Sequence, residues 1–468
     1  MPTPADSLRF VTKPWKDGLE ITGYEGEPGE SLVIPGEIDG QPVRRVGAKA
    51  FHACKSLRSV SFPDGLQSIG DDAFSKRSLG TATLPAGLEE IGAGWTCEAF
   101  EIPDSNPCFS VRDGVLFDKS GKTLILYPRK RKDKRYDVPE GVERIGDAAF
   151  KECSALESAT FPEGLVSVGK RAFFKCNALK SAAFSKGLKR LEFRAFYYCK
   201  SLARVAFPEG LESIGEGAFW YCRSLADVNF PPGLKTIEEK AFCECFALTS
   251  VSLPEGLTSI GVDAFYACES LSSVSLPKSL RTLGAVAFGC CKKLTSVELP
   301  EGLRTIEDYT FMGDNSLECV KLPDSLQSIG KCAFTWCKFT SITFPKGLET
   351  IGAEAFRWCD SLKRVEFPEG LTTIGDSAFE SCKSLADATF PGSLRTIGKG
   401  AFQFCKLKDV TFPEGVVAIG DFAFRGCFQL AKAAAPASLQ EIGREAFPEK
   451  VSFTAPEGSW AAQWIAKR

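Results

Sequence analysis

The chain contains 19 cysteines, and most of them recur at one position, three residues after a phenylalanine. Thiols at regular spacing could form disulfides or bind Zn²⁺. If the segments that carry them stack as layers about 5 Å apart, neighbouring sulfurs are too distant for a disulfide, which needs about 2.05 Å. We therefore expect reduced, buried thiols that pack as small apolar groups and donate weak hydrogen bonds to the backbone. The aligned cysteines are Cys54, Cys153, Cys176, Cys199, Cys222, Cys245, Cys268, Cys291, Cys337, Cys359, Cys382, Cys405 and Cys427.

Metal binding and catalysis have little support from the other reactive side chains. The single histidine, His52, lies between Phe51 and Cys54, and we interpret it as a surface turn residue rather than a general base. No P-loop, Gly-x-Gly-x-x-Gly or Gly-x-Ser-x-Gly motif occurs. We therefore predict from the sequence that the protein is not an enzyme and that it has no catalytic residue, no bound metal and no cofactor. The unaligned cysteines contain no Cys-x-x-Cys pair and are Cys97, Cys108, Cys243, Cys290, Cys319 and Cys332.

Large aromatic side chains often occupy the two positions between the phenylalanine and the cysteine. These positions should lie in an exposed turn, where stacked layers would place the rings along one edge. Exposed Tyr and Trp clusters are typical of interaction hot spots. The alternative is that the rings fold over their neighbours and seal the turn side. The candidate partner-binding aromatics are Tyr197, Tyr198, Trp220, Tyr221, Tyr266, Trp336 and Trp358.

A second candidate surface is the outer face of the first strand in each repeat. Side chains alternate between the two faces of a strand, so residues that flank an inward Val205 point outward. Charged and amide side chains in this column could contact a partner, and the alternative is a solvated sheet without a partner. The candidate residues are Arg204, Asp227, Asn229, Glu298, Lys321, Arg364, Glu366, Asp387 and Asp409.

The elements that would position these side chains belong to an internal repeat. Each repeat has two short apolar segments, such as residues 202–207 and 211–214, and a Pro-Glu-Gly turn separates them. Such segments are too short for helices, and we interpret them as strands joined by a turn. A repeat of this length buries its apolar side chains only by stacking on its neighbours, which predicts a solenoid. The anchor phenylalanines, 22 or 23 residues apart within each series, are Phe51, Phe74 and then Phe150, Phe173, Phe196, Phe219, Phe242, Phe265, Phe288, Phe311, Phe334, Phe356, Phe379, Phe402, Phe424 and Phe447.

The repeat Leu-x-x-Ile-Gly-x-x-Ala-Phe-x-x-Cys resembles the BspA-like, or TpLRR-type, leucine-rich repeat family. Further segments resemble that family's N-terminal cap (18–43), its irregular long repeat (104–117 and 123–128) and its closing helix (456–464). The resemblance implies a β-rich, right-handed curved solenoid with a parallel β-sheet and about 16–17 repeats. It implies an N-terminal cap at 1–47, regular repeats at 48–96 and 142–447, an irregular repeat with an inserted hairpin at 97–141, and a C-terminal cap at 448–468.

Charge and hydropathy limit the classes of binding partner and the cellular locations that we expect. Lys plus Arg number 57 against 59 Asp plus Glu, so nucleic-acid binding is not expected. The basic run at Arg129–Arg135 is interpreted as a solvated hairpin tip, although a partner with an acidic patch stays open. No apolar run approaches the roughly 18 residues of a membrane span. The polar residues 1–20 predict a cytoplasmic protein as written, with an extracellular or surface location if a leader was removed.

Together these features predict a non-enzymatic scaffold that binds protein partners of unknown identity through its strand face and aromatic turn edge. The resemblance implies an alternative, a bacterial secreted or surface adhesin that binds host proteins. A second alternative is a carbohydrate-binding or carbohydrate-active protein, which would require two acidic groups about 5–10 Å apart in a pocket.

Overall fold

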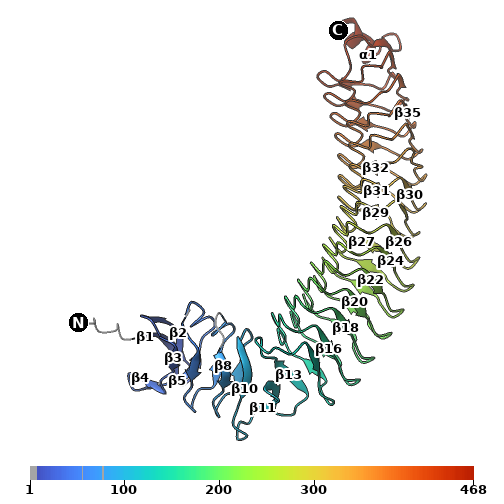
Figure 1. Cartoon of the computed structure of the whole chain (residues 1–468). Helices are drawn as coiled ribbons and strands as arrows, with labels where there is room; N and C mark the ends of the chain where they lie inside the picture. Colours follow the sequence, from blue (N-terminus) through green and yellow to red (C-terminus); the bar gives the residue numbers. More distant parts are fainter. Residues whose placement is uncertain (1–7, 55, 76–78, 468) are drawn as a thin grey trace. The chain divides into compact units, whose positions relative to one another are not determined.

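The computed structural model describes residues 8–54, 56–75 and 79–467. The chain divides into two compact units, residues 1–223 and 224–468. Each unit is a solenoid of short strands stacked layer upon layer (Figure 1). Parts of three predicted segments lie outside the described residues: 1–7 of the N-terminal cap, 55 and 76–78 of the first regular repeats, and 468 of the C-terminal cap.

Unit 1 begins with an antiparallel pair and continues into parallel layers. Strand β1 pairs antiparallel with β2, and β2, β5, β7 and β9 then follow one another in a sheet. The strands of unit 1 are β1 (Arg9–Trp15), β2 (Gly18–Glu25), β3 (Ser31–Val33), β4 (Glu37–Ile38), β5 (Gln41–Val46), β6 (Ser59–Ser61), β7 (Ser68–Ile69), β8 (Leu79–Thr83), β9 (Glu90–Ile91), β10 (Cys97–Glu101), β11 (Phe109–Arg112), β12 (Val115–Asp118), β13 (Thr123–Leu126), β14 (Arg135–Asp137), β15 (Arg144–Ile145), β16 (Ser158–Thr160), β17 (Ser167–Val168), β18 (Ser181–Ala183), β19 (Arg190–Leu191), β20 (Arg204–Ala206) and β21 (Ser213–Ile214).

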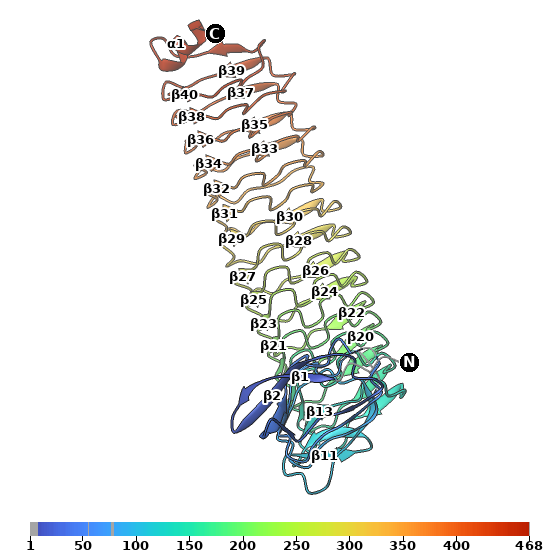
Figure 2. The ribbon, with the colours of Figure 1, turned by 90° about the vertical axis from the view of Figure 1, so that its left-hand side faces the viewer.

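Unit 2 repeats the same layer, with a first strand of three residues and a second strand of two. Figure 2 shows the two rows of strands running along this unit. Its elements are β22 (Asp227–Asn229), β23 (Thr236–Ile237), β24 (Ser250–Ser252), β25 (Ser259–Ile260), β26 (Ser273–Ser275), β27 (Thr282–Leu283), β28 (Ser296–Glu298), β29 (Thr305–Ile306), β30 (Cys319–Lys321), β31 (Ser328–Ile329), β32 (Thr350–Ile351), β33 (Arg364–Glu366), β34 (Thr373–Ile374), β35 (Asp387–Thr389), β36 (Thr396–Ile397), β37 (Asp409–Thr411), β38 (Ala418–Ile419), β39 (Lys432–Ala434), β40 (Glu441–Ile442), β41 (Ser452–Thr454) and α1 (Trp460–Lys467).

Strand pairing between layers follows the repeat length. Strand β24 pairs parallel with β26 so that Ser250 is opposite Ser273, and β18 pairs with β20 so that Ser181 is opposite Arg204. Because parallel strands in register offset by one repeat bring equivalent residues together, each repeat position becomes a column. The fold is the predicted parallel β-solenoid.

The anchor phenylalanines form the core column of each unit. Phe265 is fully buried and its ring stacks between Phe242 and Phe288, with centroids 5.3 Å and 5.2 Å away and interplanar angles of 4° and 2°. In unit 1 the rings of Phe150 and Phe173 stack at 4.7 Å. Offset stacking of this kind adds to the large apolar area that each ring buries. The column therefore joins each layer to the next.

The aligned cysteines line the turn beside this column, and their thiols are free and, at this position, buried. Ten of these sulfurs donate to the carbonyl of the anchor phenylalanine one layer earlier; for example, Cys222 Sγ lies 3.2 Å from Phe196 O and Cys268 Sγ lies 3.3 Å from Phe242 O. Cys54 Sγ instead lies 3.9 Å from Ser56 Oγ. The predicted role as small apolar groups with a backbone hydrogen bond is confirmed. A thiol suits the position because it is both apolar and a weak donor.

Asp314 replaces cysteine in one layer of this ladder. Its side chain is fully buried, Oδ1 accepts the Cys291 amide at 2.7 Å, and Oδ2 has no hydrogen-bond partner among the described residues. Loss of hydration by burial raises the pKa of the Asp314 carboxyl well above its usual 3.8. The sequence pattern did not single out this residue.

We expect Asp314 to make stability fall as pH rises. Between the usual pKa and the raised pKa the folded chain keeps the proton while the unfolded chain releases it, so the free energy of unfolding decreases through this window. The Asp314→Asn variant keeps the acceptor for Cys291 without titrating there. Urea unfolding measured from pH 4 upward should show wild type losing stability relative to Asp314→Asn. If the free energy of unfolding changes with pH in the same way in both proteins, Asp314 is not the source of the pH dependence.

An irregular repeat interrupts unit 1. Strands β11, β12 and β13 form an antiparallel meander, and β13 then pairs parallel with β15. The Trp95 ring packs on Phe74 on one side of the interruption, with centroids 5.3 Å apart and the ring planes tilted by 41°. On the other side Tyr127 stacks on Phe150 at 4.9 Å. These two rings take anchor positions that the search for phenylalanine did not identify.

Candidate functional site

Five half-buried aromatic side chains form what we call the aromatic edge of unit 1: Phe174, Tyr197, Tyr198, Trp220 and Tyr221. Tyr198 and Tyr221 stack with centroids 4.5 Å apart and an interplanar angle of 2°. Tyr197 stacks on Trp220 at 4.8 Å and contacts Phe174 at 5.4 Å. The structure therefore brings together four of the predicted binding aromatics, and their rings are partly covered by one another.

Backbone conformation places these rings in the turn. The φ angles of Tyr198 and Tyr221 are 67° and 65°, a left-handed region that bulky residues rarely adopt. Gly313 and Gly426, with φ of 79° and 74°, hold the same repeat position in unit 2. A positive φ recurs at this position in other layers, as at Glu244 (57°) and Cys290 (61°), so this conformation belongs to the repeat turn in general.

Cationic side chains lie over the rings of the aromatic edge. The Nζ atoms of Lys175 and Lys200 lie 5.7 Å and 4.7 Å from the centroid of Tyr198. The Arg194 guanidinium is 5.1 Å from Trp220, and the Arg223 guanidinium is 4.1 Å from Tyr221 and donates to its hydroxyl. Attraction between a cation and an aromatic face holds these side chains at the edge. The sequence analysis did not identify these cations.

The other predicted aromatics lie in unit 2. Trp336 and Trp358 stack at 4.9 Å with an interplanar angle of 7°, and the Trp336 side chain is 45% exposed. The Arg357 guanidinium lies 3.9 Å from the Trp358 ring. Tyr266 is half-buried, and the negative charge that Cys290 can carry, together with burial, raises its pKa to about 12. Of these three predicted residues, the two tryptophans form a stacked pair.

All of the predicted strand-face residues are exposed, in accordance with the alternation along each first strand. Several of their charges neutralise one another: Lys321 pairs with Glu298 across adjacent strands, and Arg364 pairs with Glu366 at 3.6 Å. Exposed pairs of this kind contribute little to stability. Lys321 also lines a hollow of about 850 Å³ that includes Cys319, Ile342 and Phe344.

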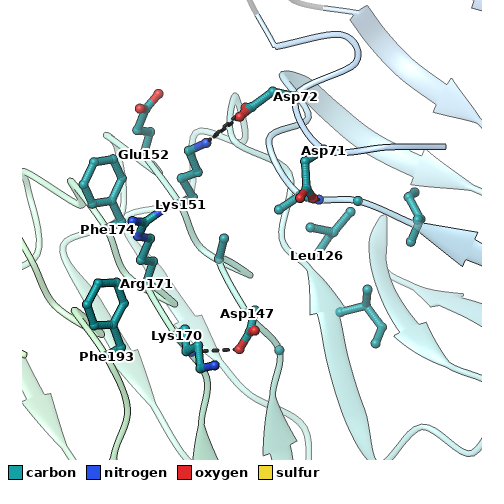
Figure 3. A pocket seen from close by; sticks show the side chains of 16 residues that line it. Asp71, Asp72, Leu126, Asp147, Lys151, Glu152, Lys170, Arg171, Phe174 and Phe193 are labelled. Carbon is teal, nitrogen blue, oxygen red and sulfur yellow. Dashed lines mark hydrogen bonds and ion pairs between the residues drawn. The ribbon is translucent and has the colours of Figure 1, made fainter. Parts of the chain in front are cut away.

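A cavity of about 770 Å³ lies in unit 1 at the irregular repeat (Figure 3). Lys151 contacts both carboxylate oxygens of Asp72, at 3.0 Å and 3.2 Å, across the cavity. The guanidinium of Arg171 lies 5.4 Å from the ring of Phe193 on the cavity wall. The repeat pattern did not predict this cavity, although the cavity lies where the repeat is interrupted between Phe74 and Phe150.

The described residues offer little for catalysis or metal binding. No group of three or more His, Cys, Asp or Glu side chains in residues 8–54, 56–75 and 79–467 is arranged to hold a metal ion. His52 Nδ1 lies 2.9 Å from Ser75 Oγ, a hydrogen bond to the next layer. Among the same residues, no helix combines the length and apolarity needed to cross a membrane.

Comparisons with known proteins identify the repeat. No curated protein matches the sequence. Solved structures that resemble it include a leucine-rich repeat protein from Bacteroides ovatus ATCC 8483 (23% identity, 97% of this chain and 99% of that chain, TM-score 0.46). Others are a leucine rich cell surface protein from Faecalibacterium prausnitzii A2-165 (21% identity, 100% and 97%, TM-score 0.38) and a leucine rich repeat protein from T. pallidum (21%, 77% and 91%, TM-score 0.23).

A family model matches most of the chain directly. Its description is BspA type leucine rich repeat region, with six copies, and it matches residues 30–101, 130–249, 235–346 and 327–454. These ranges contain the anchor phenylalanines and the aligned cysteines. The chain belongs to the BspA type leucine-rich repeat family.

Proposed function

We propose that this protein is a non-enzymatic scaffold that binds a protein partner through the aromatic edge of unit 1. The observation that carries the proposal is the stacked ladder of half-buried rings with cations over their faces. Tyr, Trp and Arg are the residue types that dominate binding hot spots. Because stacking and cation contacts already restrict these side chains, little further entropy is lost when a partner covers them.

The strand face is a weaker candidate surface. Its exposed charges are in part paired with each other, as Glu298 is with Lys321, so a partner would have to replace existing contacts. At the aromatic edge a partner gains apolar ring area and contacts to cations together. We therefore place the principal binding surface at the edge.

Replacing Trp220 and Tyr221 by Ser is expected to weaken partner binding at least about tenfold, because a hot-spot aromatic contributes about 2 kcal/mol or more to association. The measurement is capture from an extract of the source cells on immobilised protein, with bound proteins quantified by mass spectrometry. Capture is normalised to the folded fraction, which a thermal melt gives.

The matched control is Trp336→Ser in unit 2, which removes an exposed tryptophan from the same repeat position as Tyr198 and Tyr221. This control should keep the partner that the double variant loses. Equal capture per folded molecule by the double variant and wild type would show that the edge only stabilises the turns.

A further inference from the structure

Two lysines at the aromatic edge lack an acidic partner. Within the described parts of the chain, neither Lys175 nor Lys200 forms an ion pair, although both ammonium groups lie over the ring of Tyr198. Two like charges held near one ring repel each other, and an anion placed between them would relieve that repulsion. The charges of these two ammonium groups are therefore not neutralised by a carboxylate of the described residues.

Other layers show how the repeat normally neutralises a lysine at this place. Lys200 is the fourth residue after its anchor, and Lys292 and Lys383 have the same position in unit 2. Lys292 Nζ lies 2.7 Å from Glu269 Oε1 and Lys383 Nζ lies 3.1 Å from Asp360 Oδ2, in each case an acid one layer earlier. The residue one layer before Lys200 is Asn177, which carries no charge.

Other charged side chains near these lysines have contacts of their own: Glu152, which lines the same hollow as Lys175, pairs with Arg129 at 3.1 Å. Arg194 pairs with Glu216 at 3.5 Å, and Arg223 lies over Tyr221 one layer after Lys200. Arg171, over Phe193 at 5.4 Å, adds another cation beside the edge. The chain as a whole has a formal net charge of −2, so the positive charge that Lys175 and Lys200 add at the edge is local. A local field of this kind selects and steers a partner of opposite charge.

We propose that the aromatic edge binds an acidic, extended peptide segment of its partner protein. Carboxylates of that segment take the place beside Lys200 and Lys175 that Glu269 takes beside Lys292. The proposal rests on the proposed function and names the chemistry of the partner.

A single-stranded nucleic acid fits this surface less well than a peptide. Such ligands bind by stacking bases on free aromatic faces. Here Tyr198 and Tyr221 stack on each other at 4.5 Å, Tyr197 and Trp220 stack at 4.8 Å, and lysines lie over Tyr198. Ring edges, hydroxyls and cations are what a partner meets, and these suit carboxylates and a peptide backbone.

The test uses the full chain and a short fluorescein-labelled peptide of alternating glutamate and serine, with binding measured by fluorescence anisotropy. The double variant Lys175→Glu, Lys200→Glu is expected to weaken binding by about tenfold or more, equivalent to about 1.4 kcal/mol. Glutamate already occurs at both repeat positions in other layers, as Glu244 with φ 57° and as Glu269. The variant should therefore fold, and a thermal melt checks it.

The matched control is Lys292→Glu, Lys383→Glu, which makes the same charge change away from the edge. This control and wild type should bind the peptide alike, and binding by both should weaken as salt screens the charges. Equal loss in both double variants would overturn the proposal, as would tighter binding of labelled oligothymidine than of the peptide.

The two proposals fail in distinguishable ways. If wild type does not bind the peptide, yet the Trp220→Ser, Tyr221→Ser variant loses its cellular partner, the edge binds protein but the acidic-segment proposal is wrong. Peptide binding that depends on Lys175 and Lys200, together with unchanged cellular capture, would support the acidic site and reject the ring ladder as the principal surface.

Discussion

Raising the pH above about 9 is expected to unfold this protein steeply, because several buried thiols of the cysteine ladder keep their protons in the folded chain. Burial raises the pKa of the Cys222, Cys268 and Cys337 thiols above their usual 9.0. Above that pH the unfolded chain releases these protons and the folded chain keeps them, so the free energy of unfolding falls. Each such thiol removes about 1.4 kcal/mol per pH unit. Several thiols together exceed the stability of a typical domain within a few pH units.

The measurement is urea unfolding in a phosphine reductant at a series of alkaline pH values. Cys268→Ala should lower the slope of stability against pH by about 1.4 kcal/mol per unit, since one titrating group is gone. The matched control is Cys319→Ala, because Cys319 is exposed in the folded chain. If Cys268→Ala and Cys319→Ala show the same slope as wild type, the ladder thiols do not govern alkaline stability.

Phe265→Ala is expected to lower the free energy of unfolding by about 3–5 kcal/mol, the usual cost of truncating a buried phenylalanine. The cost should lie at the upper end because Phe242 and Phe288 stack on both faces of the ring, within 5.3 Å. Neighbouring layers are held by their own backbone ladders and collapse poorly into the cavity. Chemical unfolding followed by circular dichroism measures the change.

Phe428→Ala serves as the matched control, since the Phe428 side chain is 89% exposed. Its removal should change stability by less than about 0.5 kcal/mol. A Phe265→Ala variant as stable as Phe428→Ala would mean that the phenylalanine column contributes little, and that the β ladders alone hold the layers together.

The regular part of the fold was predictable because one spacing fixes every column. A period of 22 or 23 residues places each phenylalanine over the next, and the short segments around Val205 predicted the first-strand face correctly. Prediction failed where a layer uses a different residue for the same task. Trp95 and Tyr127 continue the aromatic column without matching its pattern, and Asp314 takes the place of a cysteine.

The candidate site was predictable only in part. The repeat spacing predicted that Tyr198 and Tyr221 lie side by side on one edge, because the stacked backbone places equivalent residues of neighbouring layers in one column. It did not indicate that Lys175 and Lys200 fold back over the same ring, because a long flexible side chain has several directions open to it at one position. The cavity beside Lys151 also depends on how the irregular repeat packs, which a period cannot describe.

The same backbone hydrogen bonds recur between successive layers, as when the Phe150 amide donates to the Ala172 carbonyl and the Phe173 amide donates to the Ala195 carbonyl. If one whole repeat is removed or duplicated, each backbone donor still faces the same kind of acceptor in the next layer. If half a repeat is removed, the donors and acceptors at the junction no longer match. A gene for such a chain can therefore change length by recombination in whole-repeat steps. The position of a binding edge along the array is then set by how many repeats precede it.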